Sequence, residues 1–70
     1  MADLKKVFAK NLKRLREKNE LTQEELASIL QINTRYVQRL ESKNPPNVKI
    51  ETIALLAKVL KAAPEEFFKK

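Results

Sequence analysis

Apolar residues recur at intervals of three and four positions through most of this 70-residue chain, and no other feature restricts its fold as strongly. The clearest series is Leu4, Val7, Phe8, Leu12 and Leu15, which fall on one face of a helix. The alternation of apolar and polar residues that is typical of a strand extends no further than residues 48–50. The sequence therefore predicts an all-α fold.

Capping signals place the first two predicted helices. Asp3 is a suitable N-cap for a helix that continues to about Lys18, where the apolar spacing ends. Thr22 and Glu25 have the spacing of a capping box, in which each of the two side chains accepts a hydrogen bond from the backbone amide of the other residue. A second helix is therefore expected after Thr22, with its apolar residues between positions 26 and 30.

Three further helices are expected after a short turn. Asn33 is a suitable N-cap for a third helix over residues 33–41, and the two prolines and two asparagines within residues 42–49 indicate a loop. A fourth helix is expected over residues 50–60, and the proline that begins residues 64–68 fits the first turn of a last short helix. Together these segments predict a compact five-helix bundle.

The chain contains no glycine, so every turn must be made by residues that carry a β-carbon. Helices commonly end on a residue in the left-handed conformation, which costs a residue other than glycine about 1 to 2 kcal/mol. We expect at least one of Gln31, Asn44 and Lys61 to have a positive φ angle, because the predicted helices end there.

Composition excludes most kinds of catalysis. Without cysteine or histidine, the chain has no thiolate nucleophile, no imidazole base and none of the usual zinc ligands. Its carboxylates and lysines lie on predicted solvated faces with no second group to tune their pKa, so we expect a protein that is not an enzyme and has no metal or cofactor. No binding motif for a small-molecule ligand is evident.

The length of the chain and its apolar runs limit its organisation further. Residues 1–70 are long enough for one domain only. The longest apolar run, residues 53–57, is much shorter than the roughly 20 residues that a membrane span needs. We therefore expect a single-domain cytoplasmic protein that has no membrane partner.

The chain carries 15 lysines and arginines against nine acidic residues, a formal net charge of +6. Such a charge favours polyanionic partners, with nucleic acid as the leading candidate. Charge alone leaves an alternative open, because a lysine-rich surface can also serve only to keep a small protein soluble.

Five segments of the sequence resemble the helix-turn-helix DNA-binding domains of the phage repressor, Cro and Xre type. They are LKRLR at 12–16, LTQEELA at 21–27, YVQRLE at 36–41, the predicted helix over 50–60, and PEEFF at 64–68. They follow the order of the family over nearly the whole chain. The resemblance implies a lambda-repressor-like domain that regulates transcription by binding specific sequences in double-stranded DNA.

The resemblance also implies a role for the predicted helix over residues 33–41, which in this family enters the major groove. The expected base-reading residues are those on its outward face, Thr34, Arg35, Gln38 and Arg39. The expected phosphate-binding residues are Gln23, Asn33, Tyr36, Lys43 and Asn44. Alternatives stay open: the two arginines could be solvated or touch only phosphate, and the two asparagines could serve as a cap and a loop residue.

Two positions match residues that form an ion pair in this family. Arg16 and Glu41 are expected to tie the first helix to the end of the third, a structural role rather than a catalytic or DNA-reading one.

Surplus apolar residues near the C-terminus predict a homodimer that binds a palindromic DNA site. Leu55 and Val59 lie one turn apart on the fourth predicted helix, and only one of Phe67 and Phe68 can easily enter the same core, which leaves Phe68 for the interface. In the alternative, Leu55 and Val59 pack on the first helix within one monomer.

A second function remains possible on the same scaffold, namely a protein-interaction module such as an antitoxin or an adaptor. Uncharged outward positions on the third helix would favour it. Arg35 and Arg39 occupy those positions instead and favour DNA.

Overall fold

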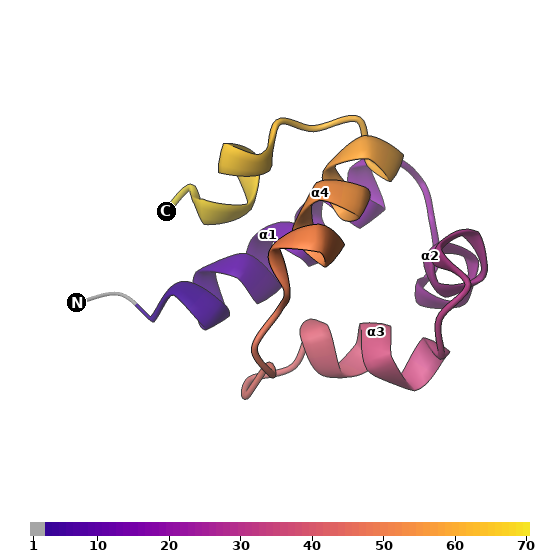
Figure 1. Ribbon diagram of the computed structural model, residues 1–70, viewed down its shortest axis with the longest axis horizontal. Coiled ribbons are helices and arrows are strands. Elements are labelled where there is room, and N and C mark those ends of the chain that lie inside the picture. Colours follow the sequence, from indigo (N-terminus) through magenta and orange to yellow (C-terminus); the bar gives the residue numbers. More distant parts are fainter. Residues whose placement is uncertain (1–2) are drawn as a thin grey trace.

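The computed structural model describes residues 3–70, which form four α-helices and one short 3-10 helix (Figure 1). The elements are α1 (Leu4–Lys18), α2 (Gln23–Leu30), α3 (Thr34–Leu40), α4 (Ile50–Val59) and η1 (Pro64–Phe68). Residues 3–70 contain no strand, so the predicted all-α fold is confirmed. None of these helices has both the length and the apolar character that crossing a membrane requires.

The prediction of five α-helices was wrong in its last element. Residues 64–68 form a 3-10 helix, in which the backbone amide of Glu66 donates to the carbonyl oxygen of Ala63, three residues earlier, at 2.9 Å. A segment of five residues is too short to gain much from the α-helical pattern, and 3-10 geometry is common in such short pieces. The bundle therefore has four α-helices and a closing 3-10 turn.

The predicted N-caps are present. The side chain of Asp3 accepts a hydrogen bond from the backbone at the start of α1 at 3.0 Å. Thr22 and Glu25 form both bonds of a capping box, at 3.0 and 2.9 Å. The side chain of Asn33 accepts from the backbone amide of Arg35 at 2.8 Å, which fixes the start of α3. Local side-chain chemistry thus sets where three of the helices begin.

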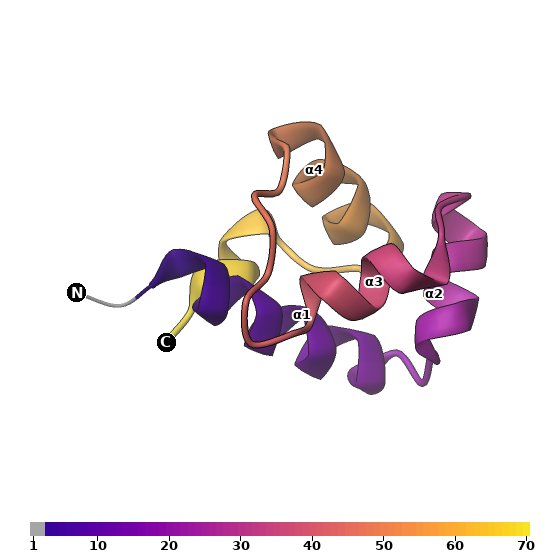
Figure 2. The same ribbon diagram turned by 90° about the horizontal axis from the view of Figure 1, so that it is seen from below.

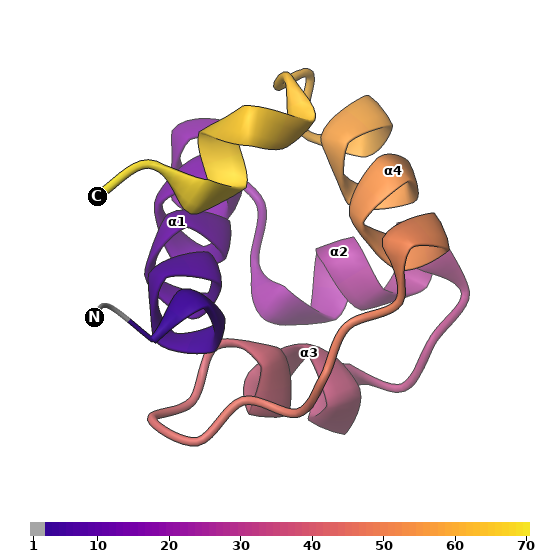
Figure 3. The ribbon, with the colours of Figure 1, turned by 60° about the vertical axis from the view of Figure 1, so that its left-hand side comes forward.

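The apolar core lies at the centre of a ring of helices, which Figure 3 shows most clearly. It consists of Phe8, Leu12, Leu15, Leu26, Ala27, Val37, Leu40, Leu56, Ala57, Leu60 and Phe67. All four α-helices and η1 contribute to it, so each element gains much of its stability from packing against the others. The rings of Phe8 and Phe67 stack with their centroids 5.3 Å apart and join the two ends of the chain.

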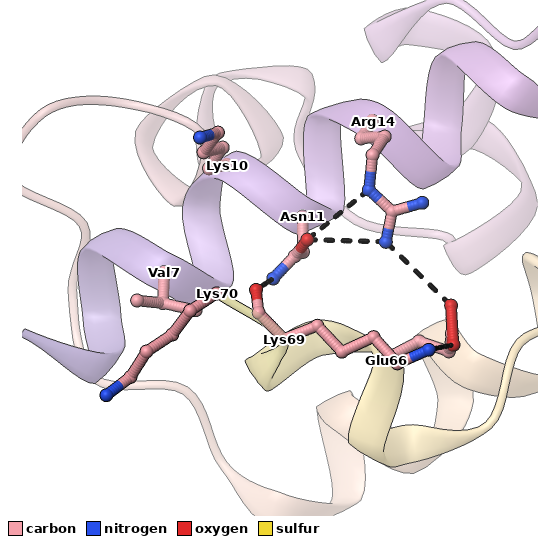
Figure 4. A pocket seen from close by; sticks show the side chains of 7 residues that line it. All are labelled: Val7, Lys10, Asn11, Arg14, Glu66, Lys69 and Lys70. Atoms are coloured by element: carbon pink, nitrogen blue, oxygen red, sulfur yellow. Dashed lines mark hydrogen bonds and ion pairs between the residues drawn. The ribbon is translucent and has the colours of Figure 1, made fainter. Parts of the chain in front are cut away.

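Asn11 holds the C-terminal segment against α1 (Figure 4). Its buried amide group donates to the carbonyl oxygens of Phe67 and Lys69, at 3.0 and 2.7 Å. Its carbonyl oxygen accepts from Arg14, whose guanidinium also lies 3.8 Å from the carboxylate of Glu66. A hydrogen bond from Lys69 lowers the pKa of Glu66 below its usual range. These contacts keep the ring of Phe67 in the core.

Three helices end on residues with positive φ angles even though none is a glycine. The φ angles are 57° at Glu20, 57° at Gln31 and 55° at Lys61. The expectation is confirmed at Gln31 and Lys61, Asn44 is not among the positive-φ residues, and Glu20 was not foreseen.

All three ends have the same hydrogen-bond pattern. The residue after each left-handed position donates its amide to a carbonyl five residues earlier, from Leu21 to Arg16, Ile32 to Ala27 and Ala62 to Ala57. This is the Schellman pattern, which requires a left-handed residue and is frequently accompanied by an apolar residue after it. Leu21, Ile32 and Ala62 are those apolar residues, and each packs on the core.

We expect Gln31→Gly to stabilise the protein by about 0.5 to 1 kcal/mol, because glycine removes the strain of the left-handed backbone at the end of α2. Ser28→Gly, at an exposed position inside the same helix, is the matched control and should destabilise by about as much. Urea unfolding followed by circular dichroism measures both free energies of unfolding. A decrease in the stability of Gln31→Gly similar to that in the control would contradict the role of strain at this turn.

Candidate nucleic-acid interface

Helices α2 and α3 form a helix-turn-helix unit whose second helix lies on the outside of the molecule (Figure 2). The turn between them is closed by the hydrogen bond from the amide of Ile32 to the carbonyl oxygen of Ala27, at 3.0 Å. The inner face of α3 contributes Val37 and Leu40 to the core, and both are almost completely buried. Burial of this face fixes which side chains α3 turns outward.

The outer face of α3 carries the polar side chains that sequence analysis selected as base readers. Arg35, Gln38 and Arg39 are exposed, and Thr34 is half-buried. The guanidinium groups of Arg35 and Arg39 therefore lie at the surface, where they are able to reach a ligand. Base reading by these four residues stays a prediction.

The candidate phosphate-binding residues surround α3, but some of their polar groups already have partners within the chain. The amide of Gln23 donates to Glu41 at 3.1 Å, and the side-chain oxygen of Asn33 caps α3. Tyr36 is half-buried and packs on the core. Lys43 and Asn44 are exposed in the loop after α3. Their roles toward DNA also remain predictions.

Arg16 and Glu41 form a bidentate ion pair that joins α1 to the end of α3. The Nε atom of Arg16 donates to one carboxylate oxygen at 2.7 Å and its Nη2 atom to the other at 3.0 Å. Only 9% and 3% of the two side chains are exposed. The hydrogen bond with Glu41 raises the pKa of Arg16 further, against the opposing effect of burial. The guanidinium therefore stays charged at every pH at which proteins fold.

The same ion pair also reaches the start of α2. The third donor group of Arg16 binds the carbonyl oxygen of Leu21 at 2.7 Å, and Gln23 binds the carboxylate of Glu41. The bond from Gln23 could not be predicted from the sequence, because a glutamine at a helix start gives no signal of its partner. These bonds hold α1, the start of α2 and the end of α3 in one relative orientation.

Comparisons with known proteins agree with this geometry. A family model described as "Helix-turn-helix" matches residues 12–67. The chain is also 38% identical over 58 residues to control protein C.SmaI of Serratia marcescens, an alignment that covers 83% of this chain and 68% of that protein. No solved structure gives a significant match to the chain.

The fold and these matches define the class of the protein. The chain belongs to the helix-turn-helix family of the phage repressor and Xre type. It is a DNA-binding regulator of transcription. Residues 3–70 contain no group of three or more acidic side chains that could hold a metal ion.

We expect Glu41→Ala to destabilise the domain by about 3 to 5 kcal/mol, because it leaves the charge of Arg16 buried without its partner. The double variant Arg16→Met, Glu41→Leu removes both charges and should be destabilised clearly less than the single variants Arg16→Met and Glu41→Leu combined. Urea unfolding of the single and double variants measures the coupling. Strictly additive effects would mean that the two side chains stabilise the fold independently.

Proposed function

We propose that this regulator binds a specific double-stranded DNA sequence as a single domain, with α3 in the major groove. The observation that carries the proposal is the outer face of α3, where two exposed arginines and a glutamine stand beside each other on a chain of net charge +6. Arg35 and Arg39 each present the fork of donors that matches the O6 and N7 atoms of guanine. Thr34 and Gln38 complete the base-reading set.

We propose that a second group of residues holds the phosphate backbone and fixes the position of α3. Gln23 lies at the first turn of α2, where the first amides of a helix have no partner within it, and Lys43 and Asn44 follow α3. Asn33 and Tyr36 lie at the start of α3, where the side-chain amide of Asn33 and the hydroxyl of Tyr36 are the groups able to reach phosphate. These contacts raise affinity for every sequence alike.

Arg35→Ala or Arg39→Ala should cost about 1 to 3 kcal/mol of binding free energy and relax base preference at one position, because each removes a fork of donors. Gln23→Ala should weaken binding to all sequences equally. Lys58→Ala, which removes a positive charge from α4, controls for the change in net charge. Each variant is titrated onto duplexes selected from a random pool, and the titration is repeated at increasing salt concentration.

Affinity of the wild type should fall steeply with salt, because phosphate contacts release counterions. Affinity that is equal for all sequences, or flat between low and physiological salt, would overturn the proposed function. Either result would be expected of a protein whose α3 binds a partner other than DNA.

We further propose that the protein pairs as a two-fold homodimer on a palindromic site, through the side that carries α4 and the C-terminal segment. Leu55 is 46% exposed and Phe68 is 38% exposed, both unusually open for large apolar side chains. Leu4 on the first helix, against which the monomer alternative would pack these residues, is itself 57% exposed. Val59 packs partly on the core, so it stands at the edge of the proposed interface.

Leu55→Glu should turn a dimer into a folded monomer, because it places a charge in the apolar interface without touching the core. Ile29→Glu, at a similarly exposed apolar position on α2, is the matched control and should leave the dimer intact. Analytical ultracentrifugation reports the mass and circular dichroism the fold. A wild type that stays monomeric at high concentration and occupies a single half-site on DNA would exclude the dimer.

A further inference from the structure

A hollow in the surface lies where the first half of α1 meets the end of α3. Its lining consists of Lys6, Ala9 and Lys10 from α1, and of Glu41, Ser42 and Lys43 from the end of α3 and the loop that follows. We call it the α1–α3 hollow. Three of its six lining residues are lysines, and they come from two segments far apart in the sequence.

The three lysines of the α1–α3 hollow are not neutralised within the described part of the chain. None of Lys6, Lys10 and Lys43 lies within ion-pair distance of a carboxylate in residues 3–70, where the ion pairs are those of Arg14, Arg16 and Lys69. Lys6 and Lys10 are also four residues apart on one helix, where like charges repel each other. Their placement costs stability, which an external anion would restore.

The one carboxylate in the lining does not cancel this positive charge. Both oxygens of Glu41 accept hydrogen bonds from Arg16, and only 3% of its side chain is exposed. The hollow therefore presents ammonium groups to solvent above a carboxylate whose charge is already paired.

A second basic hollow, shown in Figure 4, illustrates the difference. It lies between α1 and the C-terminal segment, and its lining includes Glu66 and four basic residues, Lys10, Arg14, Lys69 and Lys70. There two of the four cations approach the same carboxylate, with Glu66 lying 3.8 Å from Arg14 and 2.7 Å from Lys69. Half of its cations are paired within the described residues, whereas none of the three lysines of the α1–α3 hollow is.

We infer that the α1–α3 hollow binds a phosphate of the DNA backbone, held by Lys6 and Lys10 next to the phosphate assigned to Lys43. This inference rests on the proposed function. Figure 2 shows that α1 and the loop after α3 lie beside each other on the side of the molecule that carries α3. A helix in the major groove is flanked by the phosphate backbone, and the hollow lies at its C-terminal end. The polyanion that α3 binds thus brings phosphates toward these lysines.

The test removes the two α1 charges without changing the length of the helix. In Lys6→Gln, Lys10→Gln, the slope of log affinity against log salt should become shallower by about one for each phosphate that the variant no longer binds, with sequence preference unchanged. The matched control is Lys18→Gln, Lys61→Gln, which removes two lysines from a hollow beside the C-terminal end of α4 and should keep the wild-type slope.

Phosphate ethylation identifies the phosphate itself. Synthetic duplexes in which single phosphates are ethylated, and so uncharged, should include one or two that weaken the wild type and the control but leave Lys6→Gln, Lys10→Gln unaffected. If the double variant keeps the slope of the control, or shows the same ethylation pattern as the wild type, the inference is wrong. A wild type without specific, salt-dependent DNA binding would instead overturn the proposed function.

Discussion

The orientation of α3, the proposed DNA-binding helix, depends on the buried ion pair between Arg16 and Glu41. Apolar packing has no preferred direction, so the core alone would allow α3 to slide or rotate by small amounts. The bidentate pair is directional, and its additional bonds to Leu21 and Gln23 extend to the start of α2. Taking two charges out of water is costly and is offset only when every donor and acceptor is used. In residues 3–70 no buried side-chain nitrogen or oxygen lacks a partner.

The same pair shapes the electrostatics of the surface above it. A free carboxylate at the end of α3 would repel phosphate, and Glu41 lines the same hollow as Lys43. Because Arg16 neutralises this carboxylate, the lysines around it retain their attraction for anions. One interaction thus fixes the geometry of the interface and removes the charge that would oppose binding.

Much of this arrangement could be predicted from the sequence because it is encoded locally. Asp3, Thr22 and Asn33 mark helix starts through bonds to amides two or three residues away. The inward faces of the helices follow from the spacing of their apolar residues. The family resemblance added the pairing of Arg16 with Glu41, which spacing alone does not reveal.

The features that escaped prediction depend on contacts between distant segments or on a helix end without a cap residue. The bond from Gln23 to Glu41 needs the end of α3 in place, and the α1–α3 hollow needs α1 beside it, whereas in sequence its lysines resemble any solvated helix face. Glu20 was missed because no glycine or asparagine stands at that position to mark the end of α1. The apolar Leu21 that follows was the available signal, since it completes the Schellman pattern.

The junction between the two ends of the chain has a consequence for the order of events during synthesis. Asn11 and Phe67, which are hydrogen-bonded, lie 56 residues apart, and Phe8 stacks on the same phenylalanine. The contacts between α2 and α3 are short in sequence, so this helix pair can collapse early on the ribosome. The core around Phe8 closes only after Phe67 has emerged, and until then the helix-turn-helix unit remains attached to an unfinished, exposed apolar surface.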